Sequence, residues 1–321
     1  MPKLDALRLQ PRWVSHMGCL KGCLDFLKRD VSVPWLYGAS GHAFVLNIPP
    51  GLCPSGPTDF NTNDIVKMGR NLGYTHTEVC GWKGKDNLSE LQEAAWKMIR
   101  ESIDEGRPCY GWELDIPEYC VIYGYDESGC YISGPGCDIG KGPISWRVLG
   151  TSEIGVVEVR SLWSAEPQSL EKTLTETLSF AVKYARDAKP WTDPHSAAGL
   201  NGYDFWISEL ESLHAAQFGN AFNAVVWREC RQQAAAFLEE VCRDSEMPGP
   251  VKEHLERAAK HYGEVAAGLS QFTELYPFDS GLEMIPVEQN GDIENGAGLL
   301  KSAKHAEESG LEELDRALAR L

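Results

Sequence analysis

The stretch PCYGWELDIPEYCVIYGYDESGCYISG, residues 108–134, decides the fold of the N-terminal half of the chain. Short apolar runs alternate in it with turn residues, a pattern typical of strands in an antiparallel sheet. Residues 125–129 (YDESG) predict a hairpin turn between two of these strands. Similar runs at 145–149 and 154–163 predict further strands.

The residues before this stretch are predicted to be largely helical. Apolar side chains recur at helical spacing in residues 19–29 (CLKGCLDFLKR) and 87–105, and residues 63–72 are expected to form a shorter helix. Residues 42–48 alternate in the manner of a strand, and Pro49–Pro50 ends that segment.

Strand signals end after Pro167, and segments rich in Ala, Leu and Glu continue to the C-terminus. Their apolar periodicity predicts an up-and-down helical bundle. The sequence therefore predicts an α+β protein of two domains. Residues 1–165 form the domain with the antiparallel sheet, and residues 166–321 form an all-helical domain.

Composition excludes several classes of partner. The chain has 321 residues and a formal net charge of −17, whereas nucleic-acid binding needs a basic surface. No run of about 18 apolar residues suggests a membrane span. Ten cysteines occur without an apolar leader in the first thirty residues, which favours reduced thiols and a cytoplasmic protein.

No metal or cofactor is expected. Cys19 and Cys23 are four residues apart, but the sequence offers no second pair at the spacing of a zinc site. The glycine-rich residues 133–143 also differ from a phosphate-binding loop, because Gly142 follows Lys141 where Ser or Thr would be needed.

Four segments together resemble one known family: MGCLKGCLDFL (17–27), WLYGASGHAF (35–44), YCVIYGYDESGCYIS (119–133) and GLNGYDFWISEL (199–210). They are similar to the family of the butirosin biosynthesis protein H, whose N-terminal domain is related to the C39-type, papain-like cysteine peptidases. The resemblance implies a papain-like fold for about residues 12–160 and an acyl-transfer activity, with transfer to an amine as one form of it.

Cys19 is the candidate nucleophile. The resemblance implies a cysteine at the opening of the first helix, where the helix dipole stabilises a thiolate. The alternative is that Cys19 is a small core residue, as we expect for Cys23 in the apolar stripe of the same helix.

The catalytic base is less well matched. The resemblance implies a histidine at the start of the strand that ends in Gly124–Asp126, and this position falls on Glu118 or Tyr119. The implied Asp position falls near 133–135, where no carboxylate stands. Three candidates could replace the histidine: a desolvated Glu118, His42 from the glycine-rich loop, or His195 from the helical domain. His42 could equally be a histidine bonded at a strand edge.

Aromatic and acidic residues near the candidate base predict a substrate pocket. Trp112, Glu113 and Tyr119, with Trp35, would suit an amine-bearing substrate through charge pairing and cation–π contact. The alternative is an ordinary solvated acidic loop.

Two functions remain open at this point. The first is a cysteine-dependent hydrolase or acyltransferase that acts on a thioester or amide, with a carrier-bound acyl group or an amine as its small-molecule partner. The second is a catalytically decayed papain-like protein that binds a small molecule. Aromatic residues of the helical domain suggest a lid over the cleft or a homodimer contact, although core packing explains them equally well.

Overall fold

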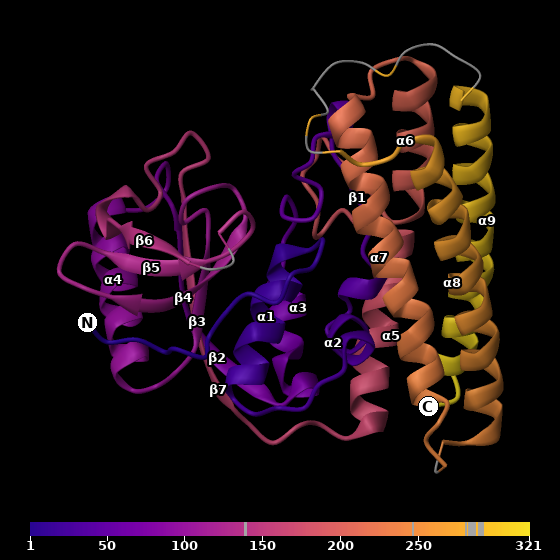
Figure 1. Cartoon of the computed structure of the whole chain (residues 1–321). Coiled ribbons are helices and arrows are strands. Elements are labelled where there is room, and N and C mark those ends of the chain that lie inside the picture. The colour runs from indigo at the N-terminus through magenta and orange to yellow at the C-terminus, as the bar shows by residue number, and fades with distance from the viewer. Residues whose placement is uncertain (138–139, 246, 280, 282–286, 288–291) are drawn as a thin grey trace. The chain divides into compact units, whose positions relative to one another are not determined.

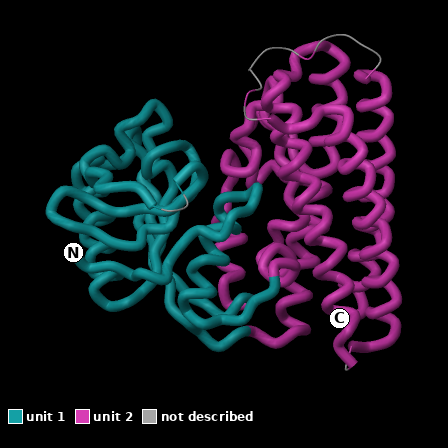
Figure 2. Tube along the Cα trace, in the orientation of Figure 1, with its two compact units in different colours: residues 1–32, 72–167 teal, residues 33–71, 168–321 magenta. Residues whose placement is uncertain are grey.

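The computed structural model describes residues 1–137, 140–245, 247–279, 281, 287 and 292–321 (Figure 1). These residues form two compact units. Unit 1 combines residues 1–32 with 72–167, and unit 2 combines residues 33–71 with 168–321 (Figure 2). The last segment of unit 1 thus ends at Pro167, close to residue 165, where the sequence predicts the domain boundary.

Residues 33–71 belong to the helical unit rather than to the N-terminal one. Gly38 illustrates the physical reason, because a Cβ atom at that position would lie 1.9 Å from Cγ of Phe237. The backbone of this segment therefore packs directly on a ring of helix α7 (Gln217–Val241).

Unit 1 contains an antiparallel sheet with the strand order β2-β7-β3-β4-β5-β6. Its strands are β2 (Tyr74–Trp82), β3 (Cys109–Trp112), β4 (Tyr119–Tyr125), β5 (Cys130–Ser133), β6 (Lys141–Ile144) and β7 (Val156–Ser164). The predicted hairpin between β4 and β5 is confirmed, since Oδ1 of Asp126 accepts hydrogen bonds from the backbone N–H groups of Ser128 and Gly129.

Helices α1 (Ser15–Phe26) and α4 (Leu88–Asp104) cover opposite faces of this sheet. Ser102 of α4 bonds to Ser161 of β7, whereas His16 of α1 lies against Tyr110, which pairs with Arg160. Adjacent strand residues such as 160 and 161 point to opposite faces. The mixed α+β class expected from the sequence is thus confirmed.

Two predicted strands are wrong. Residues 146–148 form a short 3-10 helix, η4 (Trp146–Val148), which begins where the Ser145 hydroxyl accepts a hydrogen bond from the backbone of Arg147. Residues 42–44 form another, η1 (His42–Phe44), which follows Gly41 in a left-handed conformation with a φ of 83°. Only Asn47–Ile48 (β1) is extended there, and it pairs with Ala197–Ala198 (β8).

Unit 2 is dominated by long helices: α5 (Leu170–Arg186), α6 (Leu200–Glu211), α7, α8 (Gly249–Leu275) and α9 (Asp292–Leu318). Shorter elements precede them in the chain: α2 (Val33–Ala39), η2 (Pro50–Leu52), α3 (Asn63–Lys67) and η3 (Met68–Leu72). The predicted helical C-terminal region is therefore confirmed.

A buried ion pair lies inside unit 2. The guanidinium of Arg231 and the carboxylate of Glu307 are 2.6 Å apart, and both side chains are almost fully shielded from solvent. Tyr203 donates to the same carboxylate, and Arg231 also donates to the backbone carbonyl of Val45. These bonds connect helices α6, α7 and α9 with the segment after η1.

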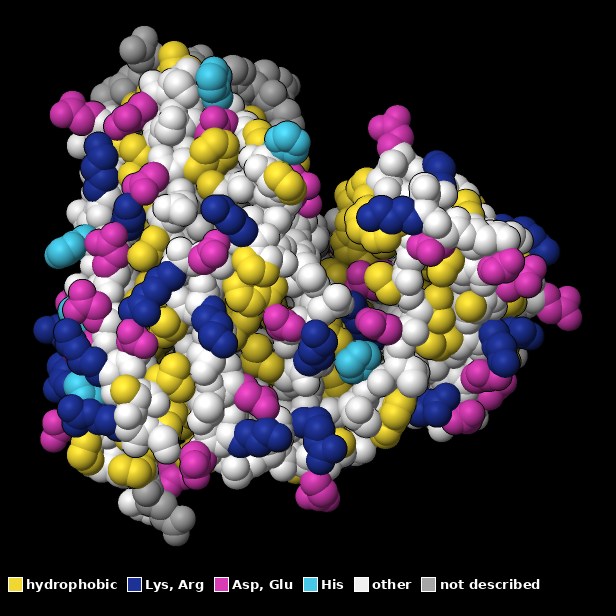
Figure 3. Space-filling view, turned by 180° about the vertical axis from the view of Figure 1, so that it is seen from behind, with side chains coloured by type: hydrophobic (Ala, Val, Ile, Leu, Met, Phe, Trp, Pro, Cys, Tyr) yellow, Lys and Arg dark blue, Asp and Glu magenta, His cyan; other side chains and the backbone are white. Residues whose placement is uncertain are grey.

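The surface carries mixed charge. Acidic and basic side chains are interspersed on the face seen in Figure 3, although the chain as a whole is strongly acidic. No helix in the described part of the chain combines the length and the apolar character that a bilayer crossing requires.

Candidate functional site

The first turn of α1 contacts the start of β4. Helix α1 begins at Ser15, four residues before Cys19. The Ser15 hydroxyl donates a short hydrogen bond to Oε2 of Glu118 and accepts one of 3.1 Å from the backbone N–H of Tyr119. Ser15 therefore occupies the helix-opening position that the family resemblance implies for Cys19.

Cys19 lies on the second turn of α1, and its side chain is fully buried. Burial raises the pKa of its thiol well above the usual value, and the neighbouring Cys120, Cys23 and Glu118 raise it further. Backbone N–H groups beyond the first helical turn are bonded within the helix. The thiol is therefore protonated at neutral pH.

Gly18 allows another part of the same unit to pass close to α1. A Cβ atom at Gly18 would lie 2.6 Å from the carbonyl oxygen of Gln10, and the Gln10 N–H donates to the Gly18 carbonyl at 3.2 Å. The space beside Gly18, where a substrate carbonyl could have approached, is thus filled by the chain itself.

Glu118 is the predicted base that does face α1. Partial burial raises the pKa of its carboxyl group, because the charged form is less well solvated, and the hydrogen bond from Ser15 opposes that rise. The backbone carbonyl of Glu118 also accepts a bond from the N–H of Glu113, which closes the hairpin between β3 and β4.

His16 is the histidine of α1, and the structure buries it. Its Nε2 atom lies 2.9 Å from the Tyr110 hydroxyl, and its ring stacks on Tyr119 with centroids 4.5 Å apart. Its place three residues before Cys19 is the sequence feature that points to it.

Tyr119, a predicted substrate contact, belongs to a buried polar network on this face of the sheet. Its hydroxyl donates to Oε1 of Glu158 at 2.9 Å, and Glu158 also binds the guanidinium of Arg160. Arg160 contacts Glu78 of the edge strand as well, at 3.0 Å. The network connects strands β2, β7 and β4, and it engages the hydroxyl group of Tyr119 in a hydrogen bond.

Trp112 and Glu113 lie at the end of β3. Both are partly exposed, and the indole N–H of Trp112 is shielded from solvent with no hydrogen-bond partner among the described residues. Glu113 has a positive φ of 51°, and its carboxylate accepts a bond of 2.8 Å from Ser152. These two predicted substrate contacts therefore lie in the same hairpin as Glu118.

The other predicted residues belong to unit 2. His42 is fully buried, and its Nδ1 atom lies 3.7 Å from the sulfur of Cys230. Burial lowers the pKa of His42 to about 4, so the ring is neutral near pH 7. The sulfur that His42 contacts is thus Cys230 of α7.

Trp35 and His195 also lie in unit 2. The indole of Trp35 donates to the Asn71 carbonyl at 3.2 Å and meets the ring of Phe237 edge-on. His195 is exposed in the segment between α5 and β8, where its backbone N–H bonds to Asp193. The structure thus brings Cys19, Glu118, Trp112, Glu113 and Tyr119 into one unit and His42, Trp35 and His195 into the other.

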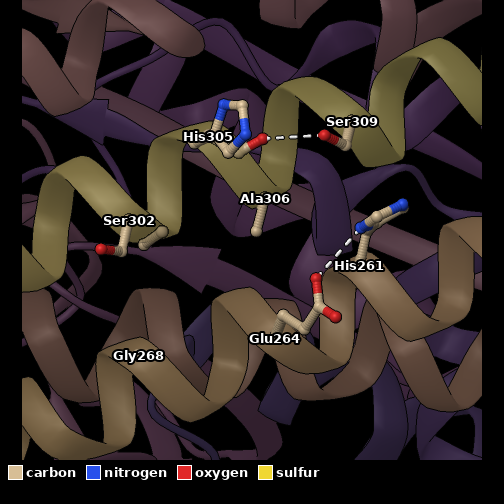
Figure 4. A pocket seen from close by; sticks show the side chains of 8 residues that line it. His261, Glu264, Gly268, Ser302, His305, Ala306 and Ser309 are labelled. Atoms are coloured by element: carbon tan, nitrogen blue, oxygen red, sulfur yellow. Dashed lines mark hydrogen bonds and ion pairs between the residues drawn. The ribbon is translucent and has the colours of Figure 1, made fainter.

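A groove between α8 and α9 is the cavity shown in Figure 4, with a volume of about 320 Å³. Ala306 points into it from α9, whereas the ring of His305 points away from α8. His261 is held by Glu264 at 3.0 Å. In the part of the chain that is described, no group of three or more histidine, cysteine or acidic side chains could hold a metal ion.

No protein-family model matches the chain, and no curated protein is significantly similar to it.

Proposed function

We propose that this chain is a small-molecule-binding protein, built on a papain-like N-terminal unit whose catalytic machinery has decayed. The observation that carries the proposal is the pair Ser15–Glu118, which stands where a cysteine–histidine pair would be needed. The papain-like character is supported by the order of the elements, a first helix followed by an antiparallel sheet against which it packs.

The chemistry of the pair argues against covalent catalysis. An imidazole takes a proton from a thiol because the two pKa values lie near each other. A serine hydroxyl is a far weaker acid, and the carboxylate of Glu118 cannot generate an alkoxide from it. Cys19 offers no substitute, because its thiol is fully buried and burial keeps its pKa high.

The competing function is the acyl-transfer enzyme with Cys19 as nucleophile and Glu118 or His42 as base. It requires a reactive thiol in unit 1, whereas the exposed cysteine of that unit is Cys80 on the edge strand β2. Thiol reactivity therefore separates the two functions.

The test is alkylation of the native full-length chain with iodoacetamide from about pH 5 to about pH 9, followed by mass-spectrometric mapping of each cysteine. We expect Cys80 to react first and Cys19 to stay unmodified until the protein unfolds. A Cys80→Ser variant is the matched control, and it should abolish the early labelling. Rapid labelling of Cys19 below its usual pKa would refute the binding proposal.

Serine chemistry needs a separate test. We expect a fluorophosphonate probe to leave Ser15 unmodified, since its hydroxyl is held by Glu118 and Tyr119. Labelling that is lost in a Ser15→Ala variant would show that Ser15 is a nucleophile and would also refute the proposal.

A further inference from the structure

A second cavity lies in unit 1, on a surface that the site around Ser15 does not use. Its volume is about 480 Å³, within the range of small-molecule sites. Its lining comes from the N-terminal residues, from α4 and from the turn between β4 and β5: Met1, Pro2, Trp96, Arg100, Tyr125, Asp126 and Glu127.

The main chain fixes the shape of this cavity. The carbonyl of Pro2 accepts a bond of 3.2 Å from the N–H of Tyr125, and the N–H of Leu4 donates to the Tyr123 carbonyl at 2.7 Å. Residues 2–4 are therefore held along the end of β4 and form one wall.

The aromatic part of the lining is also held in place. The ring of Trp96 stacks on Trp146, with centroids 6.1 Å apart and ring planes 6° from parallel. Tyr125 meets Trp96 edge-on at 5.7 Å, and its hydroxyl bonds to Asp104 at 2.8 Å. A ligand ring would thus meet rigid aromatic walls with little loss of side-chain freedom.

The cationic side chain in the lining of this cavity is Arg100. Arg100 lies over Trp96 at 5.5 Å from the ring centroid, and its side chain is exposed. The carboxylate of Asp126 already accepts hydrogen bonds from two backbone N–H groups and from the hydroxyl of Tyr131. Arg100 can therefore bind an anionic group of a ligand, and a carboxylate fits its paired donors.

We propose that this cavity binds a planar aromatic carboxylate. Its ring packs against Trp96 and Tyr125, and its carboxylate bonds to Arg100. The exposed carboxylate of Glu127 on the rim opposes a second negative charge, which favours a monocarboxylate over a phosphate. This inference rests on the proposed binding function and names its ligand class.

The test is isothermal titration of the full chain with 2-naphthoate. We expect saturable binding of one molecule per chain. The neutral 2-naphthamide, the non-aromatic cyclohexanecarboxylate and the dianionic 2-naphthyl phosphate should each bind about tenfold more weakly or not at all. An amide or a phosphate that binds as tightly as 2-naphthoate would overturn the ligand class.

Variants locate the site. Arg100→Gln should weaken binding of 2-naphthoate about tenfold without affecting folding, since its side chain is exposed. Trp96→Ala should also weaken binding about tenfold, because it removes one aromatic wall. Lys97→Gln, exposed on the same helix, is the control that should leave binding unchanged. Absent binding, or unchanged binding in Arg100→Gln, would overturn this inference while the alkylation result decides the proposed function separately.

Discussion

The hydroxyl of Ser15 and the carboxylate of Glu118 are bonded to each other, although 103 residues separate them in the sequence. This bond joins the first turn of α1 to the start of β4, and the same hydroxyl accepts the N–H of Tyr119. One small side chain thus satisfies both a carboxylate and a backbone donor. Ser15 thus joins the two elements through its hydroxyl group.

Replacing Ser15 with Ala should destabilise the protein by about 1–3 kcal/mol, because the Glu118 carboxylate and the Tyr119 N–H both lose a partner in a poorly hydrated place. Urea unfolding would measure the free energy. Ser212→Ala is the matched control, since Ser212 is exposed and bonds to the backbone of its own helix region. If Ser15→Ala lowers the free energy of unfolding no more than Ser212→Ala does, the two hydrogen bonds of Ser15 do not stabilise the fold.

Glu118→Gln should change how stability depends on pH. Burial raises the pKa of Glu118, so the folded protein holds this proton more tightly than the unfolded chain does. The wild type therefore gains stability from protonation at low pH and loses this gain as the pH rises through the raised pKa. Gln keeps an acceptor for Ser15 but cannot titrate.

The measurement is the difference in unfolding free energy between wild type and Glu118→Gln from about pH 4 to about pH 8. We expect the wild type to be favoured more at the acidic end than at the basic end. A difference that stays constant, or that changes in the opposite direction, would show that the folded protein does not raise this pKa.

The sequence predicts strands β3, β4, β5 and β7 of unit 1 because each is an apolar run bounded by turn residues, whereas it does not predict β2 (Tyr74–Trp82) and β6 (Lys141–Ile144). The runs at 109–112, 119–125 and 130–133 are rich in apolar and aromatic residues, and Asp126–Gly129 supplies the turn. The strand predicted at residues 42–44 is wrong for a local reason, because Gly41 adopts a left-handed conformation that turns the chain away from a strand. Alternation alone does not reveal such a turn.

The site was only half predictable. Glu118 was reached through the family resemblance, by counting back from Gly124–Asp126, whereas Ser15 resembled any serine at the beginning of a helix. Only the tertiary contact distinguishes it. The grouping of residues 33–71 with unit 2 was equally hidden, because it depends on the close packing of Gly38 against Phe237, nearly two hundred residues later in the chain.

Breaking the buried ion pair of unit 2 should be costly. In Glu307→Gln the guanidinium of Arg231 remains buried without its counter-ion, and such a loss costs about 3–5 kcal/mol. Asp315→Asn is the control, because its pair with Arg186 is half exposed and is expected to contribute about 0–1 kcal/mol. Urea unfolding of both variants would show the difference, and equal losses would contradict the buried-charge argument.

His42 provides the sharpest test of burial in unit 2. The folded protein lowers the pKa of His42 from 6.5 to about 4, chiefly because the charged ring would be desolvated. The unfolded chain therefore takes up this proton first as the pH falls. The folded state should lose stability between about pH 6.5 and about pH 4, by up to roughly 3 kcal/mol at 1.36 kcal/mol per pKa unit.

A His42→Asn variant removes this titration, so its unfolding free energy should fall less steeply than that of the wild type over the same pH range. His305→Asn is the control, because the His305 side chain is 85% exposed and its removal should leave the pH dependence unchanged. Parallel curves for wild type and His42→Asn would mean that water reaches the ring. His42 and Cys230 would then be in contact with solvent. His42 would again be a candidate for the catalytic base.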